Sequence, residues 1–210
     1  MRLYAGVTIG ASGLLYGTAN KGGDAAPDCP QSGTVFELEP PAVSGGTWAE
    51  KLVYSFCNNG DPTVGVTIGS GGVLYGATTP TNTGRTHGSV FSLTPPASSG
   101  ASWTFGSIWK FPYDVSTYPT SSSLAIGAGG VAYGTSSTGG AISRGGVRRG
   151  FLFDSTCVFG RHVDRDHPSR LHWQRRANPQ AGVVIGPGAI YGTTYYGRSS
   201  NNGTVFSLTL

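Results

Sequence analysis

The chain alternates short apolar runs with glycine-rich turns, and the whole pattern recurs at a fixed period. Its clearest marker is a tyrosine followed by glycine at positions 16, 75, 133 and 191, at steps of 59, 58 and 58 residues. A fixed period of this size indicates a repeat architecture. The sequence therefore predicts about four units, at residues 5–62, 63–120, 121–180 and 181–210, within a single repeat domain.

Each unit opens with two short apolar runs that predict a β-hairpin. In the first unit, residues 7–10 (Val-Thr-Ile-Gly) precede the turn 11–13 and residues 14–17 (Leu-Leu-Tyr-Gly). Glycine in the turn supplies the positive φ that a tight hairpin connection needs. The same order of run, turn and run returns at residues 66–76, 124–134 and 183–192.

A third strand is predicted after a polar loop, at residues 33–38 (Gly-Thr-Val-Phe-Glu-Leu). Val35 would face one side of the sheet, and Phe36 with Leu38 the other, which is the period-two pattern of a strand. Closely similar runs stand at residues 88–93 and 203–208.

A fourth strand follows a Pro-Pro pair, at 40–41 and again at 95–96, because proline cannot continue a central strand. Trp48 and Trp103 each stand 12 residues after a phenylalanine (36 to 48 and 91 to 103). They open the runs 48–56 and 103–111, which complete four predicted strands per unit.

One four-stranded sheet cannot bury both of its faces, so successive units should stack face to face. The sequence predicts an all-β fold, a β-propeller-like array of about four 58-residue repeats, with the third repeat disrupted and the fourth truncated after its third strand. The 35 glycines and the low charged fraction of 11% agree with short strands and many turns. No apolar run of the roughly 20 residues that span a membrane is present, and no signal peptide is visible.

The repeated pattern Gly-x-Leu-Tyr-Gly-Thr-Thr, Gly-Thr-Val-Phe-x-Leu-Thr-Pro, Trp and Tyr-Ser-Phe resembles the GloVer-type tandem repeat of bacterial surface and secreted proteins. The resemblance covers nearly the whole chain outside residues 149–176. It implies a propeller-like array that is tethered at the cell surface by a separate anchor. It implies no catalytic residues and no cofactor.

The third unit departs from the pattern in a strongly basic window. Residues 144–176 hold eight arginines and three aspartates, whereas the rest of the chain has six basic and seven acidic residues, a net of 6 − 7 = −1. The basic excess of the chain, whose pI is about 9.1, therefore lies in this window. Arginines can bind phosphate backbones by charge alone, but no other basic surface is predicted to join them, so we expect no nucleic-acid partner.

A shift of reading frame accounts for this window. If Ser155 to Leu171 is back-translated and read one base later, the codons permit Pro-Pro-Ala-Ser-Ser-Gly-Gly-Thr-Trp and then Thr-Glu-Thr-Ile-Leu-His-Ala-Phe. These are the missing Pro-Pro pair, turn, tryptophan and last strand, in order. The hypothesis is that residues from about 149 to 176 are translated out of frame between two compensating insertions or deletions.

Several residues of the window are common metal ligands, but their spacing matches no zinc pattern and we expect no metal site. They are Cys157, His162, Asp164, Asp166, His167 and His172.

Other candidate residues have a structural interpretation beside a functional one. Tyrosines 16, 75, 133 and 191 could line a sugar-binding face, although packing between repeats is favoured. Asp61 and Asp114 are expected to cap turns before the next unit. Cys29 and Cys57 lie in one unit and could pair if the protein is exported, but the sequence does not decide between the paired and the free state. The sequon at Asn202 is also a turn before a strand.

The function expected from these observations is that of a non-enzymatic extracellular or cell-surface scaffold for binding or adhesion, present here as a fragment of a longer repeat protein. Its ligand would be a carbohydrate or a protein. A propeller-fold carbohydrate-active enzyme is the alternative, but it would need convergent acids or histidines, and the regular repeats offer only His87 and scattered acids. A decayed gene product without a selected function is the third interpretation.

Overall fold

The computed structural model describes residues 2–3, 5–22, 33–57, 60–79, 88–98, 100–110, 118–119, 123–138, 151–153, 156–158, 179–196 and 202–209. Regular structure in these ranges consists of β-strands and single 3-10 turns, so the predicted all-β class is confirmed. The chain divides into two compact units, Met1–Phe111 and Pro112–Leu210. Each unit is described by itself.

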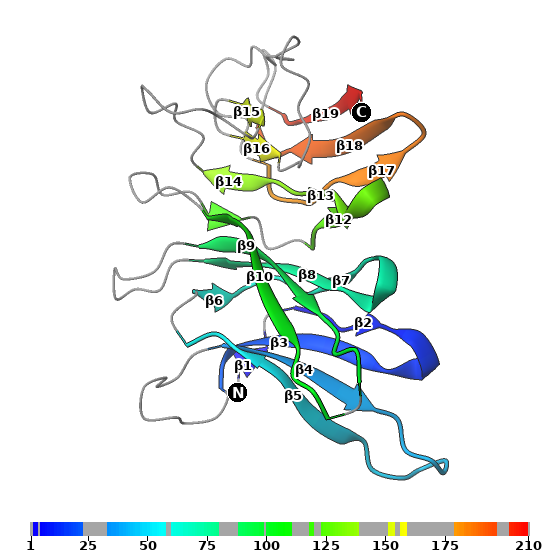
Figure 1. The fold of residues 1–210 in the computed structure, drawn as a ribbon. Helices are drawn as coiled ribbons and strands as arrows, with labels where there is room; N and C mark the ends of the chain where they lie inside the picture. Colours follow the sequence, from blue (N-terminus) through cyan, green and yellow to red (C-terminus); the bar gives the residue numbers. More distant parts are fainter. Residues whose placement is uncertain are drawn as a thin grey trace. The chain divides into compact units, whose positions relative to one another are not determined.

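The first unit begins with an antiparallel sheet whose strands follow the chain (Figure 1). Its strands are β1 (Arg2–Leu3), β2 (Thr8–Ile9), β3 (Leu15–Lys21), β4 (Thr34–Glu39) and β5 (Ala49–Ser55). Strand β3 pairs with β4 along one edge and with both β1 and β2 along the other. The sheet thus has the four predicted strand positions, with the first position divided between two short strands.

A second sheet of the same plan completes the first unit. Its strands are β6 (Asp61–Pro62), β7 (Thr67–Ile68), β8 (Leu74–Thr79), β9 (Ser89–Thr94) and β10 (Thr104–Lys110). Here β6 and β7 share one edge of β8. Although the sequence period places β6 at the end of the first repeat, its pairing with β8 assigns it to the second sheet.

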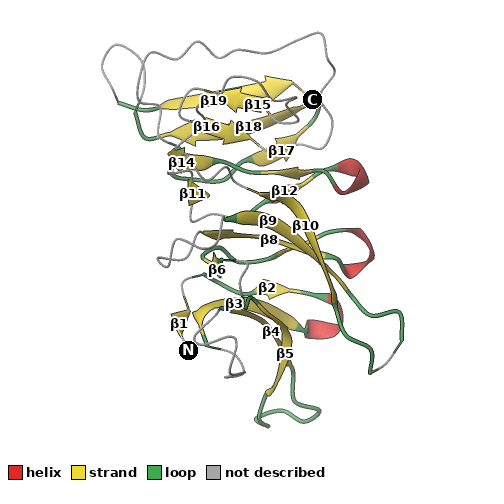
Figure 2. Ribbon diagram, turned by 60° about the vertical axis from the view of Figure 1, so that its left-hand side comes forward, coloured by secondary structure: helices red, strands yellow, loops and turns green. Residues whose placement is uncertain are grey.

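Three of the four predicted hairpin turns are 3-10 turns, η1 (Ala11–Gly13), η2 (Ser70–Gly72) and η3 (Ala128–Gly130), which Figure 2 shows in red. In each turn the last two residues have positive φ, with values of 58° and 79° in η1 and 68° and 75° in η2. Ser12 occupies the first of these positions in η1. Glycine adopts this backbone conformation without steric cost, which explains the Gly-Gly pairs of the other two turns.

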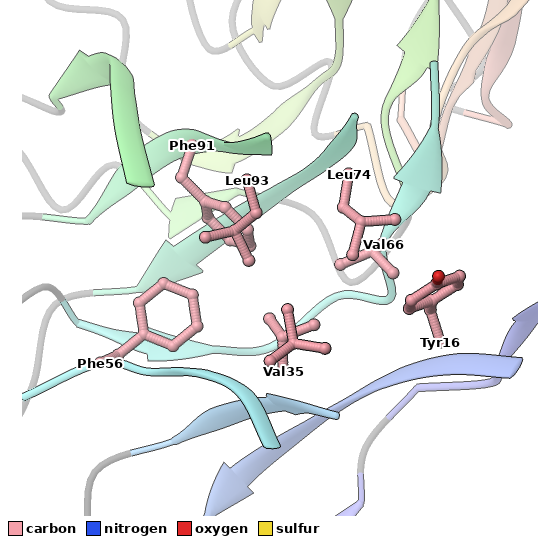
Figure 3. Close-up of a cluster of buried hydrophobic side chains, with 8 residues drawn as sticks. Tyr16, Val35, Phe56, Val66, Leu74, Phe91 and Leu93 are labelled. Carbon is pink, nitrogen blue, oxygen red and sulfur yellow. The ribbon is translucent and has the colours of Figure 1, made fainter. Parts of the chain in front are cut away.

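The two sheets of the first unit face each other across an apolar core, which Figure 3 shows in close-up. One side of the core consists of Tyr16, Val35 and Val53 of the first sheet and Phe56, which directly follows β5. The other side consists of Leu74, Phe91 and Leu93 of the second sheet and Val66, which directly precedes β7. The predicted alternation within the third strand of each repeat is therefore confirmed, since Val35 faces forward along the chain and Phe91 and Leu93 face back. Face-to-face stacking of successive repeats is present in this unit.

The second unit holds shorter sheets. Strand β11 (Tyr118–Pro119) pairs with β14 (Ser136–Thr138), and β12 (Ala125–Ile126) pairs with β13 (Ala132–Tyr133). A three-stranded sheet is formed by β17 (Val184–Gly186), β18 (Ala189–Thr194) and β19 (Thr204–Thr209). Within the basic window, the described residues form one hairpin, β15 (Phe151–Phe153) with β16 (Thr156–Val158).

Candidate functional site

In three of the four Tyr-Gly pairs the glycine lies under a phenylalanine ring of the neighbouring strand. A Cβ atom on Gly17 would stand 2.4 Å from Cζ of Phe36, and one on Gly192 would stand 2.4 Å from Cζ of Phe206. Gly76 and Phe91 repeat the contact at 2.5 Å. Because real Cβ atoms do not approach other atoms so closely, the ring occupies the space that any larger residue would need. This contact accounts for two of the repeated residues.

A second glycine contact explains the end of the Val-Thr-Ile-Gly run. A Cβ atom on Gly10 would lie 2.7 Å from the ring of Tyr16 and 3.5 Å from Cδ1 of Ile68 in the next repeat. In the second unit, Gly127 has the same relation to Tyr133 and Ile185, at 2.9 and 3.5 Å. The isoleucine of each of these runs therefore points back toward the preceding repeat.

Threonine hydroxyls connect successive repeats through hydrogen bonds to the main chain. Thr18 Oγ1 donates to the carbonyl oxygen of Val64 over 3.0 Å, and Thr135 Oγ1 donates to that of Ala181 over 2.7 Å. Donor and acceptor are 46 residues apart in both cases. Thr8 Oγ1 also donates forward, to the carbonyl oxygen of Val66. Buried carbonyl groups need such partners.

The repeated tyrosine is part of a polar and aromatic contact in the first repeat. Tyr16 is only 9% exposed and stands opposite Glu37 of β4. Burial of the phenol, then its hydrogen bond to the Glu37 carboxylate and the charge of that group, raise the pKa of Tyr16 to about 12. The ring meets Trp103 of the second repeat edge-to-face, with centroids 6.0 Å apart. At Tyr16 the structure supports the packing interpretation.

Ionic and hydroxyl contacts complete this junction. Lys21 Nζ lies 2.9 Å from Oδ2 of Asp61, so the end of β3 is joined to β6. The expectation that Asp61 caps a turn is wrong, because Asp61 is a strand residue that pairs with Thr79 and binds Lys21. In the second sheet, Thr78 Oγ1 accepts the backbone N–H of Ser89 over 3.0 Å. Each of these polar groups serves a contact between strands or sheets.

The remaining candidates differ in what the structure describes. Asp114, His87, Cys29 and the histidines and aspartates of the basic window lie outside the described residues, and of Cys157 the structure describes the backbone alone, in β16. Among the side chains described, no three His, Cys, Asp or Glu residues gather in a way that could hold a metal ion. The turn interpretation of the sequon is confirmed, since Gly203 has a φ of 82° and Thr204 begins β19.

Cys57 forms a disulfide bond. Cys29, the partner that the sequence offers for it without deciding the pairing, lies outside the described residues. The bond places a covalent constraint at the end of the first repeat, two residues after β5.

Sequence reasoning missed Glu37, Lys21 and the threonine bonds. Glu37 could have been found from the register, because a strand residue opposite a buried tyrosine shares its face. Thr18 and Thr135 occupy the same position after Tyr-Gly, which is a signal of a shared role. Lys21 and Asp61 have no such signal, since the ion pair depends on how β6 joins the second sheet.

Neither a comparison with protein-family models nor one with curated proteins found a match for this chain. The resemblance to the GloVer-type repeat therefore stays a prediction based on the residues quoted for it. Within the part of the chain that the structure describes, no helix has the length and apolar character needed to cross a bilayer.

Proposed function

We propose that this chain is a non-enzymatic repeat protein of the cell surface or extracellular space, with a β-propeller-like arrangement, that acts as a binding or adhesion scaffold. The observation that supports the proposal is that the repeated residues make packing and hydrogen-bond contacts. Tyr16, Thr18 and Gly17 all serve contacts within or between sheets. Residues that recur for packing define a scaffold, whereas a binding function belongs to the segments that connect its strands.

The disulfide at Cys57 supports the proposed location. Disulfide bonds form and persist in oxidising compartments and are rare in the cytosol. We therefore expect that Cys57 of the native protein, isolated from the surface fraction or the medium, does not react with an alkylating reagent until its disulfide bond is reduced. Alkylation followed by mass spectrometry would measure this, and would also identify the cysteine to which Cys57 is joined.

The binding role is tested with the purified chain on a panel of glycans and of extracellular proteins. The expected result is saturable binding of one ligand class that leaves the ligand chemically unchanged. The decisive second measurement is the release of reducing ends from any bound polysaccharide. Release above that of the heat-unfolded chain would overturn the scaffold proposal in favour of an enzyme, and an absence of binding across the panel would favour a decayed gene product.

A further inference from the structure

Stacking in the first unit has a direction, because the two sheets meet through different faces. The face of the first sheet that carries Tyr16, Thr18 and Val35 is called here the forward face. The opposing face of the second sheet, with Ile68, Leu74, Phe91, Leu93 and Trp103, is called the rear face, and the same names apply to corresponding residues in every repeat. The forward face supplies the threonine donor, and the backbone beside the rear face supplies the carbonyl acceptor.

The rear face of the first sheet is exposed. Ile9 is 73% exposed and Trp48 is 44% exposed, whereas their counterparts Ile68 and Trp103 pack against the core. Leu52, which pairs with Phe36 on this face, is 43% exposed. Three large apolar side chains on one sheet face form the kind of contiguous patch that marks an interaction surface.

The sheet of β17, β18 and β19 exposes the complementary forward face. Tyr191 is 40% exposed and Val205 is 74% exposed, while their counterparts Tyr16 and Val35 are 9% and 0% exposed. Val184, opposite Tyr191 in the register, is 66% exposed. The residues that alternate with these, such as Ile190 and Phe206, are buried, so the exposure belongs to one face.

We propose that the chain associates head to tail with a second copy of itself, the forward face of β17–β19 packing on the rear face of the first sheet of the other copy. The interface would continue the one that already joins the two sheets of the first unit. Tyr191 would meet Trp48 of the second copy as Tyr16 meets Trp103. Thr193, in the position of Thr18, would donate to the carbonyl of Ala5, in the position of Val64.

The exposed residues fit this partner better than a generic apolar surface. Each face repeats the main residues of an interface that the same chain already forms: Tyr191, Thr193 and Val205 correspond to Tyr16, Thr18 and Val35 of the forward face, and Ile9 and Trp48 correspond to Ile68 and Trp103 of the rear face. Val53 and Phe56 have no counterpart in the described sheet β17–β19. Glu50, a charge on the rear face, stands where β10 has Phe105, which stacks on Tyr54 of β5. Among the described residues, β17–β19 has no strand equivalent to β5, so Glu50 needs no apolar partner there.

Such an interface is heterologous, which gives it a distinctive test. Ile9→Asp damages the rear face alone, and Val205→Asp damages the forward face alone. Both positions are highly exposed in the single chain, so both variants should keep the far-ultraviolet circular dichroism of the unmodified protein. Sedimentation velocity over a concentration series should show self-association of the unmodified chain and a loss of about tenfold or more in each variant.

Mixing the two variants gives the decisive result. Ile9→Asp retains a forward face and Val205→Asp retains a rear face, so an equimolar mixture should form a one-to-one dimer that cannot extend. Val43→Asp is the matched control, because Val43 is 70% exposed but lies in the connection between β4 and β5. This control should associate as the unmodified chain does. If an aspartate variant loses its fold, Trp48→Ala and Tyr191→Ala replace the pair.

The proposal is overturned if the unmodified chain stays monomeric at every concentration, which would indicate that these faces are covered by further repeats of a longer chain or by a different partner. Undiminished self-association of Ile9→Asp or of Val205→Asp alone would also overturn it, because the copies would then associate without a forward face packing on a rear face. Failure of the folded variants to pair when mixed has the same consequence. None of these outcomes depends on the binding role proposed above.

Discussion

Two glycines of the first repeat, Gly10 and Gly17, are required by aromatic rings rather than by turns. Gly17 lies in the middle of β3, where glycine normally weakens a strand. The Phe36 ring fills the space beside it, and the aromatic side chain gains burial that a Cβ atom would prevent. A residue that is unfavourable for local strand formation is thus favoured by packing.

Gly17→Ala should lower the free energy of unfolding by roughly 1–3 kcal/mol, because the new methyl group overlaps the Phe36 ring and forces it to move. Chemical denaturation measures the change. Gly6→Ala is the matched control, since nothing lies within 4 Å of a Cβ there and the effect should stay within about 0.5 kcal/mol. Equal effects at the two positions would contradict the ring contact.

The raised pKa of Tyr16 predicts a loss of stability at high pH. The folded-state pKa of about 12 exceeds the ordinary value of 10.0, so the protonated phenol is favoured in the folded chain. Its contribution is complete below pH 10 and is lost as the pH rises from about 10 to about 12. Denaturation curves at increasing pH should show this loss.

Tyr16→Phe should lack this alkaline loss of stability, while the control variant Tyr191→Phe should retain it, because Tyr16 is still present in that variant. The absorbance of tyrosinate, followed through the same titration, gives a second measurement. An ordinary titration of all tyrosines near pH 10 would contradict the raised pKa of Tyr16.

At the scale of the element, the first repeat differs from the second and third in the second residue of its hairpin turn. Ser12 has a φ of 58°, in the left-handed region that costs a residue with a Cβ roughly 1–2 kcal/mol, whereas Gly71 stands at the same place in η2. Ser12→Gly should therefore raise the free energy of unfolding by about 0.5 kcal/mol after the added chain entropy of glycine is subtracted. Gly71→Ser should lower it by a similar amount. Thermal unfolding of both variants checks the opposite signs, and equal signs would show that backbone conformation does not decide them.

The threonine bond between repeats is a second property of the elements. Thr18→Val keeps the side-chain shape but leaves the Val64 carbonyl without its hydroxyl partner, which should cost about 1–3 kcal/mol of stability. Thr193→Val removes the same hydroxyl from an exposed position of β18 and should change the stability of the dilute chain little. Denaturation at low protein concentration compares the two. If Thr193→Val destabilised the monomer as much as Thr18→Val, the bond to Val64 would not be the cause.

Strand order and hairpins were predictable because they follow from local pattern. Alternation at Val35 and Phe36, glycine in the turns and the Pro-Pro pairs are all readable over a few residues. The division of the first strand position between β1 and β2, and between β6 and β7, was not predictable. Two-residue strands such as Asp61–Pro62 have no period to detect, and their pairing depends on the path of the chain around β8.

At the scale of the whole molecule, the basic window interrupts the repeat pattern, and it lies almost entirely outside the described residues. We predict that sequencing the gene across the codons for residues 140–180 will locate two compensating insertions or deletions. A chain encoded in the restored frame should gain the Pro-Pro pair, the tryptophan and the last strand of the third repeat. Limited proteolysis should then find it more resistant than the present chain. DNA that confirms the present frame, together with unchanged proteolysis of the restored chain, would contradict the hypothesis.

The side chains on the faces of the sheets determine how successive sheets pack on one another. The sequence predicted stacking from the general need to cover both faces of a sheet, but it did not predict the direction of that stacking. Direction comes from side chains far apart in sequence, such as Thr18 with Val64 and Tyr16 with Trp103. Contacts of this kind depend on how two completed sheets meet, which no short window of sequence contains.

The hydrogen bond between a threonine and a carbonyl 46 residues later occurs twice in the chain, and this has a consequence for how the gene of a repeat protein can gain or lose repeats. The acceptor is a main-chain carbonyl, whereas the donor is present only where a threonine follows Tyr-Gly, as at Thr18 and Thr135 but not at Ala77. Unequal recombination that adds or deletes a whole period therefore leaves a main-chain acceptor at every junction and keeps the bond wherever the preceding repeat carries the threonine. The number of repeats is then free to drift between related genes, while a shift of one base inside a repeat, which removes the side chains of a junction altogether, is not repaired by any change in length.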